Sequence, residues 1–476
     1  MWDPISTTTM ASVDYLKAAT HLWPTIQSFV PTIRTFFSTH PVLSLQSWLT
    51  YYASVDPLHT AICICILSST GVYVAQQATG NASQVDRIWT FAPVWYGAHF
   101  ALQPVIASKI IAGGWAKETL NHISNDPVAK INFWGKQATA SGNVTATLEP
   151  RLALMLALQL LWSARLTFNA YRRGFFKVGE EDYRWPELRK MMARWQWELF
   201  AFFFIAIAQN ILLAITALPQ YMILSTTFAP RARLSTQTSL NLGTADYVLT
   251  AVFLANLGME FLSDHQQQVY QNWKRGYKAT LFGMPQKRAG TSSDKQVTKS
   301  TSNDEAAVFG RVAGGDDQTL FTEDDRKRGF VTKGLWAWSR HPNFACEQLV
   351  WWLLYLFVPI TFAPSLFGCS GSLASFFGIS RPHTLREMVK LGHALALNYA
   401  VISPFAMNLL FASSTAFTEK MTKAKYPAYG SYQKIVAPFN PLETVLRKAY
   451  FELFAGDDEK RKVKEEVWGK PTEKRA

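Results

Sequence analysis

One stretch of the chain gathers side chains that could bind a polar or charged ligand, directly before a long apolar segment. These side chains are Arg340, His341, Asn343 and Glu347. Pro342 disfavours helix at the residue before it and suits the first turn of a helix that follows, so the group should lie around a helix start. The free N–H groups of a helix start bind phosphate, and a planar guanidinium offers a fork for the same group. The stretch therefore predicts a site for a phosphate-bearing cofactor.

Asn343 and Glu347 are four residues apart. At that spacing they share one helical face and could hydrogen-bond a single ligand. The alternative is structural. Arg340 would then anchor the chain at a membrane surface, and Glu347 would be a first-turn partner of the helix dipole.

Two further groups of charged residues lie at the ends of apolar runs. Arg165 falls inside such a run, where a charge costs about 3 kcal/mol on insertion scales unless the side chain reaches the membrane surface. Glu260 and Asp264 are four residues apart at the end of another run, and like charges at this spacing repel unless a cation lies between them. His265 follows, but the three residues lack the spacing of a metal site, so no metal is predicted.

Tyrosines mark two other stretches. Tyr183 and Arg184 lie in the charged stretch 180–185, which is either a solvated loop or a lid with Tyr183 as a hydroxyl donor. The second stretch follows the last apolar segment and holds Tyr426, Tyr429 and Tyr432. It forms either an interfacial aromatic belt or the wall of a cofactor pocket.

The elements that must position these residues are membrane helices. Of the 476 residues, 49% are hydrophobic and 17% are charged, whereas soluble domains carry about 25% charged residues. Seven segments are long and apolar enough to cross a bilayer, in which open sheets cannot satisfy their backbone groups. We expect spans near 57–77, 88–111, 152–170, 198–218, 244–262, 348–366 and 388–411. The predicted fold class is an all-α polytopic membrane helix bundle.

The distribution of Lys and Arg predicts the orientation. The connections 171–197, 263–347 and 412–476 hold 33 of the 47 Lys and Arg residues, whereas the connections on the opposite side hold 9. The positive-inside rule therefore places these three regions and the C-terminus in the cytosol. The same regions account for the net charge of +13 through attraction to an anionic leaflet. We find no nucleic-acid-binding module and predict no nucleic-acid partner.

The spans divide the chain into five predicted parts. Residues 1–56 form an N-terminal region that contains either an interfacial helix or an eighth span. Residues 57–284 hold the first five membrane helices and the cytosolic loop 171–197. The Ser, Thr, Lys and Asp-rich insertion 285–325 is too polar to bury a core, and we expect it to be disordered. Residues 326–455 form the C-terminal part, and residues 456–476 form a charged tail, of which we also expect 459–476 to be disordered.

Several chemistries are excluded by motif. The four cysteines Cys63, Cys65, Cys346 and Cys369 cannot build a disulfide framework and are better explained as small buried hydrophobes. The chain has no Gly-x-Ser-x-Gly, no Walker-type phosphate loop, no Gly-x-Gly-x-x-Gly after a strand and no Cys-x-x-Cys.

The stretch Gly334-Leu-Trp-Ala-Trp-Ser-Arg-His-Pro-Asn-Phe-Ala-Cys-Glu347 resembles the signature Gly-Leu-Trp-x-Tyr-Ser-Arg-His-Pro-Asn-Tyr-x-x-Glu. That signature belongs to membrane proteins with a steroid 5-alpha-reductase-like C-terminal domain. The resemblance covers most of the chain. It extends to Asp86-Arg-Ile-Trp-x-x-x-Pro93, Trp162-x-x-Arg165-Leu, Glu181-Asp-Tyr-Arg184-Trp, Asp264-x-Gln266 and Glu419…Tyr426-Pro-x-Tyr429-x-x-Tyr432.

The resemblance implies an all-α membrane enzyme whose C-terminal half binds NADPH from the cytosol and reduces a carbon–carbon double bond of a small lipid. By position, the residues lining the cofactor pocket would be Arg340, His341, Asn343, Glu347, Tyr426, Tyr429 and Tyr432. Arg165, Arg184 and Asp264 would close it, and Tyr183 would donate the proton that accompanies the hydride. The resemblance also implies residence in the endoplasmic reticulum.

Two departures and two rivals qualify this expectation. Phe344 replaces the signature's tyrosine and removes a hydroxyl, and Cys346 replaces a residue that is commonly small. Membrane isoprenylcysteine methyltransferases share an Arg-His-Pro-x-Tyr and a Glu…Tyr-x-x-Tyr arrangement but bind S-adenosylmethionine. The upstream Asp-Arg-x-Trp and Glu-Asp-Tyr-Arg blocks favour the reductase. A non-catalytic protein of the same fold is the third possibility.

Overall fold

The computed structural model describes residues 20–113, 148–177, 179–226, 242–279, 285–287, 321–362 and 398–469. The chain divides into two compact units. The first unit comprises Met1–Ala164, Glu181–Phe253 and Trp351–Ala406. The second comprises Arg165–Glu180, Leu254–Val350 and Met407–Ala476. Four of the five boundaries fall inside long helices, which therefore contribute residues to both units, and the boundary between Glu180 and Glu181 falls between helices.

The predicted all-α membrane bundle is confirmed. Six helical segments are long and apolar enough to cross a membrane: α4 (Pro57–Thr79), α9 (Pro150–Arg172), Arg194–Ile215, α14 (Thr244–Lys274), Pro342–Thr361 and Tyr399–Lys425. The third of these runs through α11 (Arg194–Phe200), the π-helical segment η2 (Ala201–Ala208) and α12 (Gln209–Ile215). The fifth lies in α17 (Pro342–Phe362), and the last joins η7 (Tyr399–Val401) to α20 (Ile402–Lys425).

The predicted span 88–111 is helical but is not one of the six. It is divided between α5 (Gln84–Trp89) and α6 (Ala92–Ala112). Polar side chains lower its hydropathy, and they are bound inside the first unit. His99 Nε2 lies 2.8 Å from Pro57 O and 2.9 Å from Thr60 Oγ1, and Gln103 donates to Tyr52 O.

The last predicted span, 388–411, is displaced toward the C-terminus. Its described helix is Tyr399–Lys425, and residues 388–397 lie outside the described part of the chain. The helix continues past residue 411 because no proline or glycine follows until Pro427. As a result, Glu419 lies within the helix, where sequence analysis had placed a loop.

The N-terminal region contains α2 (Leu22–Thr39) and α3 (Leu45–Ser54). A further short helix of the first unit, α13 (Leu218–Thr226), comes later in the chain. Neither α2 nor α3 is among the six membrane-spanning candidates. α2 exposes Trp23 and Val30. An orientation of this region along a membrane surface stays a prediction.

A buried ion pair joins α9 to α14 in the first unit. Arg151 binds both carboxylate oxygens of Asp246, at 2.7 and 2.8 Å, and donates to Thr361 Oγ1 on α17 at 3.0 Å. Both charged residues are completely shielded from solvent. The paired geometry satisfies two charges that apolar surroundings would otherwise disfavour.

We predict that Asp246→Asn lowers the free energy of unfolding by about 3 kcal/mol, because Arg151 keeps a buried charge without its partner. Thermal unfolding of the protein in detergent measures the effect. The double variant Arg151→Met/Asp246→Leu removes both charges and should recover most of the loss. An equal loss in the double variant would contradict the ion-pair explanation.

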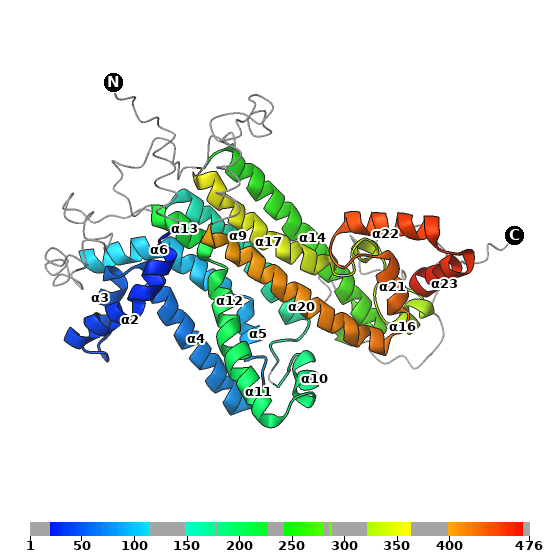
Figure 1. The fold of residues 1–476 in the computed structure, drawn as a ribbon, viewed down its shortest axis with the longest axis horizontal. Coiled ribbons are helices and arrows are strands. Elements are labelled where there is room, and N and C mark those ends of the chain that lie inside the picture. The colour runs from blue at the N-terminus through cyan, green and yellow to red at the C-terminus, as the bar shows by residue number, and fades with distance from the viewer. Residues whose placement is uncertain are drawn as a thin grey trace, which may run out of the picture. The chain divides into compact units, whose positions relative to one another are not determined.

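Three short helices build the C-terminal part of the second unit. α21 (Tyr429–Ile435), α22 (Pro441–Phe454) and α23 (Asp457–Trp468) enclose a core of Phe330, Tyr429, Tyr432, Val436, Val463 and Val467. They lie together with α16 (Glu323–Arg328) (Figure 1). The expectation of disorder at 459–476 is wrong for 459–468, because Val463 and Val467 give α23 an apolar face that packs into this core.

The predicted disorder of 285–325 is likewise wrong at both ends of that segment. Residues 285–287 form strand β2, which pairs in antiparallel register with β1 (Tyr277–Ala279), Tyr277 opposite Lys287. These are the only strands among the described residues, and they lie outside the six membrane-spanning candidates. At the other end, residues 323–325 begin α16. Residues 288–320 lie outside the described part.

Asp325 fastens the start of the C-terminal part. Its carboxylate pairs with Arg328 at 2.6 Å and with Lys333 at 2.7 Å, and it accepts the backbone N–H of Thr322 at 2.8 Å. Burial raises the pKa of Asp325, but Lys333 and Arg328 outweigh burial and hold the pKa below its ordinary value. Ionised Asp325 is therefore the stabilising form.

We predict that Asp325→Asn destabilises the protein by about 3 kcal/mol at neutral pH. Because the folded-state pKa is lowered, the stabilisation is present above the unfolded pKa of about 4 and is lost as pH falls through the folded value. Unfolding of the wild type and the variant, measured between neutral pH and pH ~3, should show a shrinking difference. A difference that does not change with pH would contradict this account.

Candidate cofactor site

The centre of the site is Arg165, which lies among three carboxylates within the second unit. Its guanidinium is 2.6 Å from Asp264, 2.8 Å from Glu260 and 3.0 Å from Glu347. All four residues are at least nine-tenths buried. α9 supplies the cation, α14 two acids and α17 the third. Arg165 is therefore the cation that the spacing of Glu260 and Asp264 requires, and its side chain is buried in the second unit.

Asn343 joins this cluster from the first turn of α17. Its side-chain N–H donates to Asp264 Oδ1 at 3.1 Å. Its own Oδ1 is buried without a hydrogen-bond partner among the described residues. The helix start is held by Asn256, which donates to Cys346 O at 2.9 Å. Asn343 and Glu347 thus converge on one group of side chains, as their spacing predicts.

The cluster holds more negative than positive charge. If Glu260, Asp264 and Glu347 were all ionised, Arg165 would leave two negative charges uncompensated in a buried place, which is energetically costly. Glu260 Oε2 and Arg165 Nε have no hydrogen-bond partner among the described residues. The arrangement therefore favours a bound proton on one carboxyl, or a ligand that brings hydrogen-bond donors or positive charge.

Arg172 is a second buried cation on α9, about two turns beyond Arg165. Its guanidinium lies over the rings of Phe168 and Phe261, at 5.5 and 5.7 Å, and donates to Asn169 at 3.0 Å. Sequence analysis did not assign this residue to the site. Its position one residue before another arginine, at the end of an apolar run, was the available signal.

The loop before α17 is fastened to α14 by Gln266. Gln266 Oε1 accepts the backbone N–H of Leu335 at 2.9 Å. Gly334 has φ +65°, and a Cβ at this position would lie 2.6 Å from Gln266 Oε1. The glycine is therefore needed for both its backbone conformation and its close approach.

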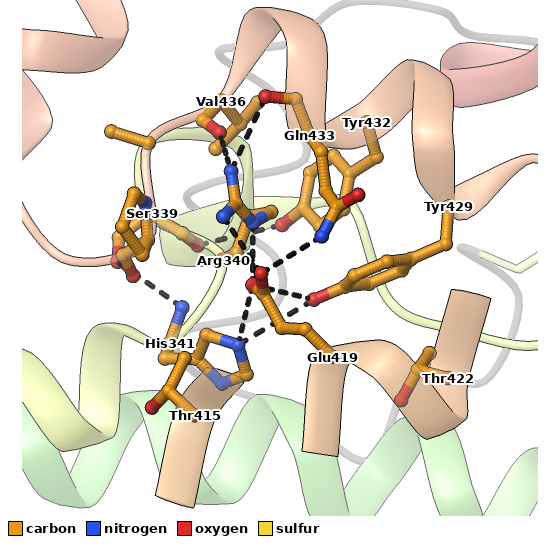
Figure 2. A network of polar contacts seen from close by, with 12 residues as sticks. Ser339, Arg340, His341, Thr415, Glu419, Thr422, Tyr429, Tyr432, Gln433 and Val436 are labelled. Carbon is orange, nitrogen blue, oxygen red and sulfur yellow. Dashed lines mark hydrogen bonds and ion pairs between the residues drawn. The ribbon is translucent and has the colours of Figure 1, made fainter. Parts of the chain in front are cut away.

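Glu419 on α20 organises a second network, shown in Figure 2. Arg340 binds its two carboxylate oxygens at 2.6 and 2.9 Å. Its other donors are His341 at 2.9 Å, Tyr429 at 3.0 Å and Gln433 at 2.9 Å. One carboxylate thus holds the loop before α17 against α21.

Arg340 is occupied by protein acceptors. Besides Glu419, its guanidinium donates to the carbonyl oxygens of Val436 and Gln433. Burial lowers the pKa of Arg340, but the hydrogen bonds and charge of Glu419 outweigh burial and raise it. All three guanidinium nitrogens of Arg340, which sequence analysis predicted to bind phosphate, therefore bind protein acceptors. The backbone N–H of Arg340 donates to Ala437 O at 2.9 Å.

The three predicted tyrosines differ in their contacts. Tyr429 contacts Glu419, and burial together with that carboxylate raises its pKa well above the ordinary value. Tyr432 donates to the carbonyls of Trp336 and Ser339, and burial raises its pKa as well. Tyr426 accepts from Lys274 Nζ at 2.9 Å, and although burial raises its pKa, Lys274 lowers it by more.

Tyr183 and Arg184 belong to the first unit, whereas the other predicted site residues belong to the second. Arg184, the first residue of α10 (Arg184–Lys190), pairs with Asp182 at 2.8 Å. The neighbouring Trp185 donates to Asp86 at 2.7 Å. Burial raises the pKa of Asp86, and Arg184 opposes this effect. The Tyr183 side chain is 58% exposed, and its role as a proton donor stays a prediction.

Comparison with known proteins places the chain in a family. Residues 131–372 match the family described as "Protein of unknown function (DUF1295)". The chain belongs to the DUF1295 family. It is also 27% identical over 391 residues to an uncharacterized protein of the fission yeast Schizosaccharomyces pombe, a match covering 82% of this chain and 81% of that protein. No solved structure matches.

The DUF1295 match contains the whole Arg165 cluster, together with Arg340 and His341. Glu419 and the three tyrosines lie beyond it. Sequence analysis quoted Glu419 in a motif but did not assign it to the site. An acidic residue shortly after an apolar run was the signal that could have identified it.

We predict that two substitutions that each remove a charge from the Arg165 cluster have different effects on the free energy of unfolding. Glu260→Gln removes one excess acid and should change the free energy of unfolding by less than ~1 kcal/mol, or raise it. Arg165→Met removes the cation from three acids and should lower it by at least ~3 kcal/mol. Thermal unfolding in one detergent compares the two. Similar losses would show that the cluster is not over-acidic.

Proposed function

We propose that this protein is a membrane reductase that uses NADPH to saturate a carbon–carbon double bond of a lipid or steroid-like substrate. The observation that carries the proposal is the buried group formed by Arg165, Asn343 and Glu347 with Glu260 and Asp264. The motif resemblance supports the same assignment. In this proposal the membrane is that of the endoplasmic reticulum, and the C-terminus faces the cytosol.

The polar atoms of the cluster suit the uncharged part of NADPH. The nicotinamide carboxamide and the ribose hydroxyls are hydrogen-bond donors, and Asn343 Oδ1 and Glu260 Oε2 are buried acceptors without a partner among the described residues. Arg165 Nε is an available donor for a carbonyl. These atoms would hold the nicotinamide end.

Phosphate groups do not suit this acidic cluster. The Arg340 guanidinium binds Glu419 and backbone carbonyls, so we assign Arg340 and His341 to positioning the start of α17. Positive charge for the phosphates is available at the end of α9, where the exposed Arg173 follows the buried Arg172. We therefore propose that the phosphates lie toward this end of α9.

When bound, NADPH supplies the hydride for the reduction. The chain must supply a proton, and the Arg165 cluster is suited to hold one, because three carboxyls surround a single guanidinium. Burial of Glu260 and Glu347 keeps that proton from exchanging freely with bulk water. The acids lie on α14 and α17, two helices able to cross a membrane, which is where a lipid would arrive.

A second candidate function is S-adenosylmethionine-dependent methylation of a lipid. The excess of carboxylates over cations around Arg165 complements the sulfonium and ammonium charges of S-adenosylmethionine. NADPH is strongly anionic and lacks this complementarity. The motif resemblance and the unpartnered acceptor and donor atoms of the cluster favour the reductase, whereas its excess of carboxyl groups favours the methyltransferase.

Ligand-dependent stability separates these functions. We predict that saturating NADPH raises the unfolding temperature of the purified protein, since a ligand at 100 times its Kd adds about 2.7 kcal/mol. Asn343→Leu should abolish the shift by removing the acceptor. Gln348→Leu is the matched control, because Gln348 lies on the next turn of α17 and donates to Phe344 O outside the cluster. Thermal unfolding in detergent measures all three proteins.

Each outcome has a meaning. A shift with S-adenosylmethionine and none with NADPH establishes the methyltransferase and refutes the reductase. No shift with either supports a non-catalytic protein. For the reaction itself, lipid profiles of cells lacking the protein should show an unsaturated lipid that the wild type converts and Glu347→Ala does not.

A further inference from the structure

Helix α22 exposes a row of large apolar side chains. They are Leu442, Val445, Leu446, Tyr450, Leu453 and Phe454, whose exposed fractions lie between 47% and 76%. They recur at intervals of three and four residues, so they form one continuous stripe along the 14-residue helix. A stripe of this kind is unusual on a surface that faces water.

The opposite side of α22 is fixed to the protein. Thr444 is fully buried, donates to Trp338 O at 2.7 Å and accepts from Ala437 N at 2.8 Å. Phe451, two turns later, packs in the core with Val463 and Val467. The helix therefore cannot turn its apolar stripe inward without losing these contacts.

The charged side chains on the flanks of the stripe are held within the fold. Lys448 donates to Ala337 O at 3.3 Å and lies over the ring of Trp338 at 5.1 Å. Arg447 pairs with Glu443 at 2.6 Å, and Lys464 of α23 pairs with Glu452 at 2.8 Å. Arg447 also donates to Gln433 O at 3.0 Å. A partner recognised by charge has little to bind here, and the available driving force is burial of apolar surface.

The position of α22 in the chain indicates what covers the stripe. α20, the last membrane-spanning candidate, ends at Lys425, and α22 begins at Pro441 after the packed helix α21. The stripe thus begins within a short distance along the chain from the bilayer. Tyr450 and Phe454, whose ring centroids are 4.7 Å apart, are aromatic residues of the kind that lie at membrane surfaces.

A second copy of the chain fits this stripe less well. A helix of 14 residues is about 21 Å long and its stripe holds six apolar side chains, whereas each partner of a stable complex contributes about 20–30 residues. We propose that α22 is an interfacial helix whose apolar stripe inserts into the leaflet on the side that the basic loops predict to be cytosolic. It would hold the end of the second unit against the bilayer.

The test places a nitroxide label on the full-length protein in phosphatidylcholine nanodiscs. Leu446→Cys reports on the stripe, and Arg461→Cys on the solvent-exposed side of α23 is the matched control, both in a background without the four native cysteines. We expect the label at 446 to collide several-fold more often with lipid-soluble oxygen than with a water-soluble nickel complex. The label at 461 should show the reverse preference.

Three results would overturn the proposal. Preferential collision with the nickel complex at 446 means that the stripe faces water. Dipolar broadening between labels at 446 means that a second copy covers it. Low accessibility to both reagents without broadening means that another segment of the chain covers it.

A second measurement avoids the cysteine substitutions. A benzophenone amino acid replaces Tyr450 in the otherwise unaltered chain, and mass spectrometry identifies its photo-adducts. The same amino acid in place of Arg461 is the control. Phospholipid adducts at 450 and none at 461 support the proposal. Adducts with a second copy of the chain, or within the same chain alone, overturn it.

Discussion

The second unit depends on one electrostatic constraint: Arg165 and its acidic partners are buried on helices that are apolar enough to cross a membrane. A lone charge in such a place costs several kcal/mol, so Arg165 has to be paired, and the pairing brings Glu260, Asp264 and Glu347 from two other helices to one point. Any slip of α14 or α17 by one residue would rotate an acid away from the guanidinium. The charge cluster therefore fixes the register of three helices at once.

The Arg165 cluster also contains polar groups that the ion pairs do not satisfy. Three acids are more than one guanidinium neutralises, and Asn343 Oδ1, Glu260 Oε2 and Arg165 Nε have no partner among the described residues. A cluster built only for stability would be expected to satisfy these atoms, since unsatisfied buried polar atoms are costly. These unpartnered atoms are the physical reason for proposing a ligand at this cluster. The excess of carboxyl groups is the reason that a sulfonium compound competes with NADPH as that ligand.

The Glu419 network and the C-terminal helices serve this cluster indirectly. Glu419 accepts from four side chains, so it is satisfied internally and holds Arg340 and His341 immediately before Asn343. The signature residues of the Arg-His-Pro-Asn motif thus separate into two groups, one that fixes the helix start and one that faces the acidic cluster. α22 also has two different faces. Its inner face is fixed by the buried Thr444, and its outer face, with the exposed Leu446, favours an apolar environment.

The sequence by itself determined the elements and the residue types at their ends. Apolar length specified the membrane helices, and the four-residue spacings of Glu260 with Asp264 and of Asn343 with Glu347 specified shared faces, because both follow from local helix geometry. Partners distant in the chain were decided only by the tertiary structure. Arg165 is 182 residues from Glu347 and Arg340 is 79 from Glu419, and no local pattern records such pairs. Order in the charged helix α23 was also decided there, since two valines suffice to fold it only when a core is available to receive them.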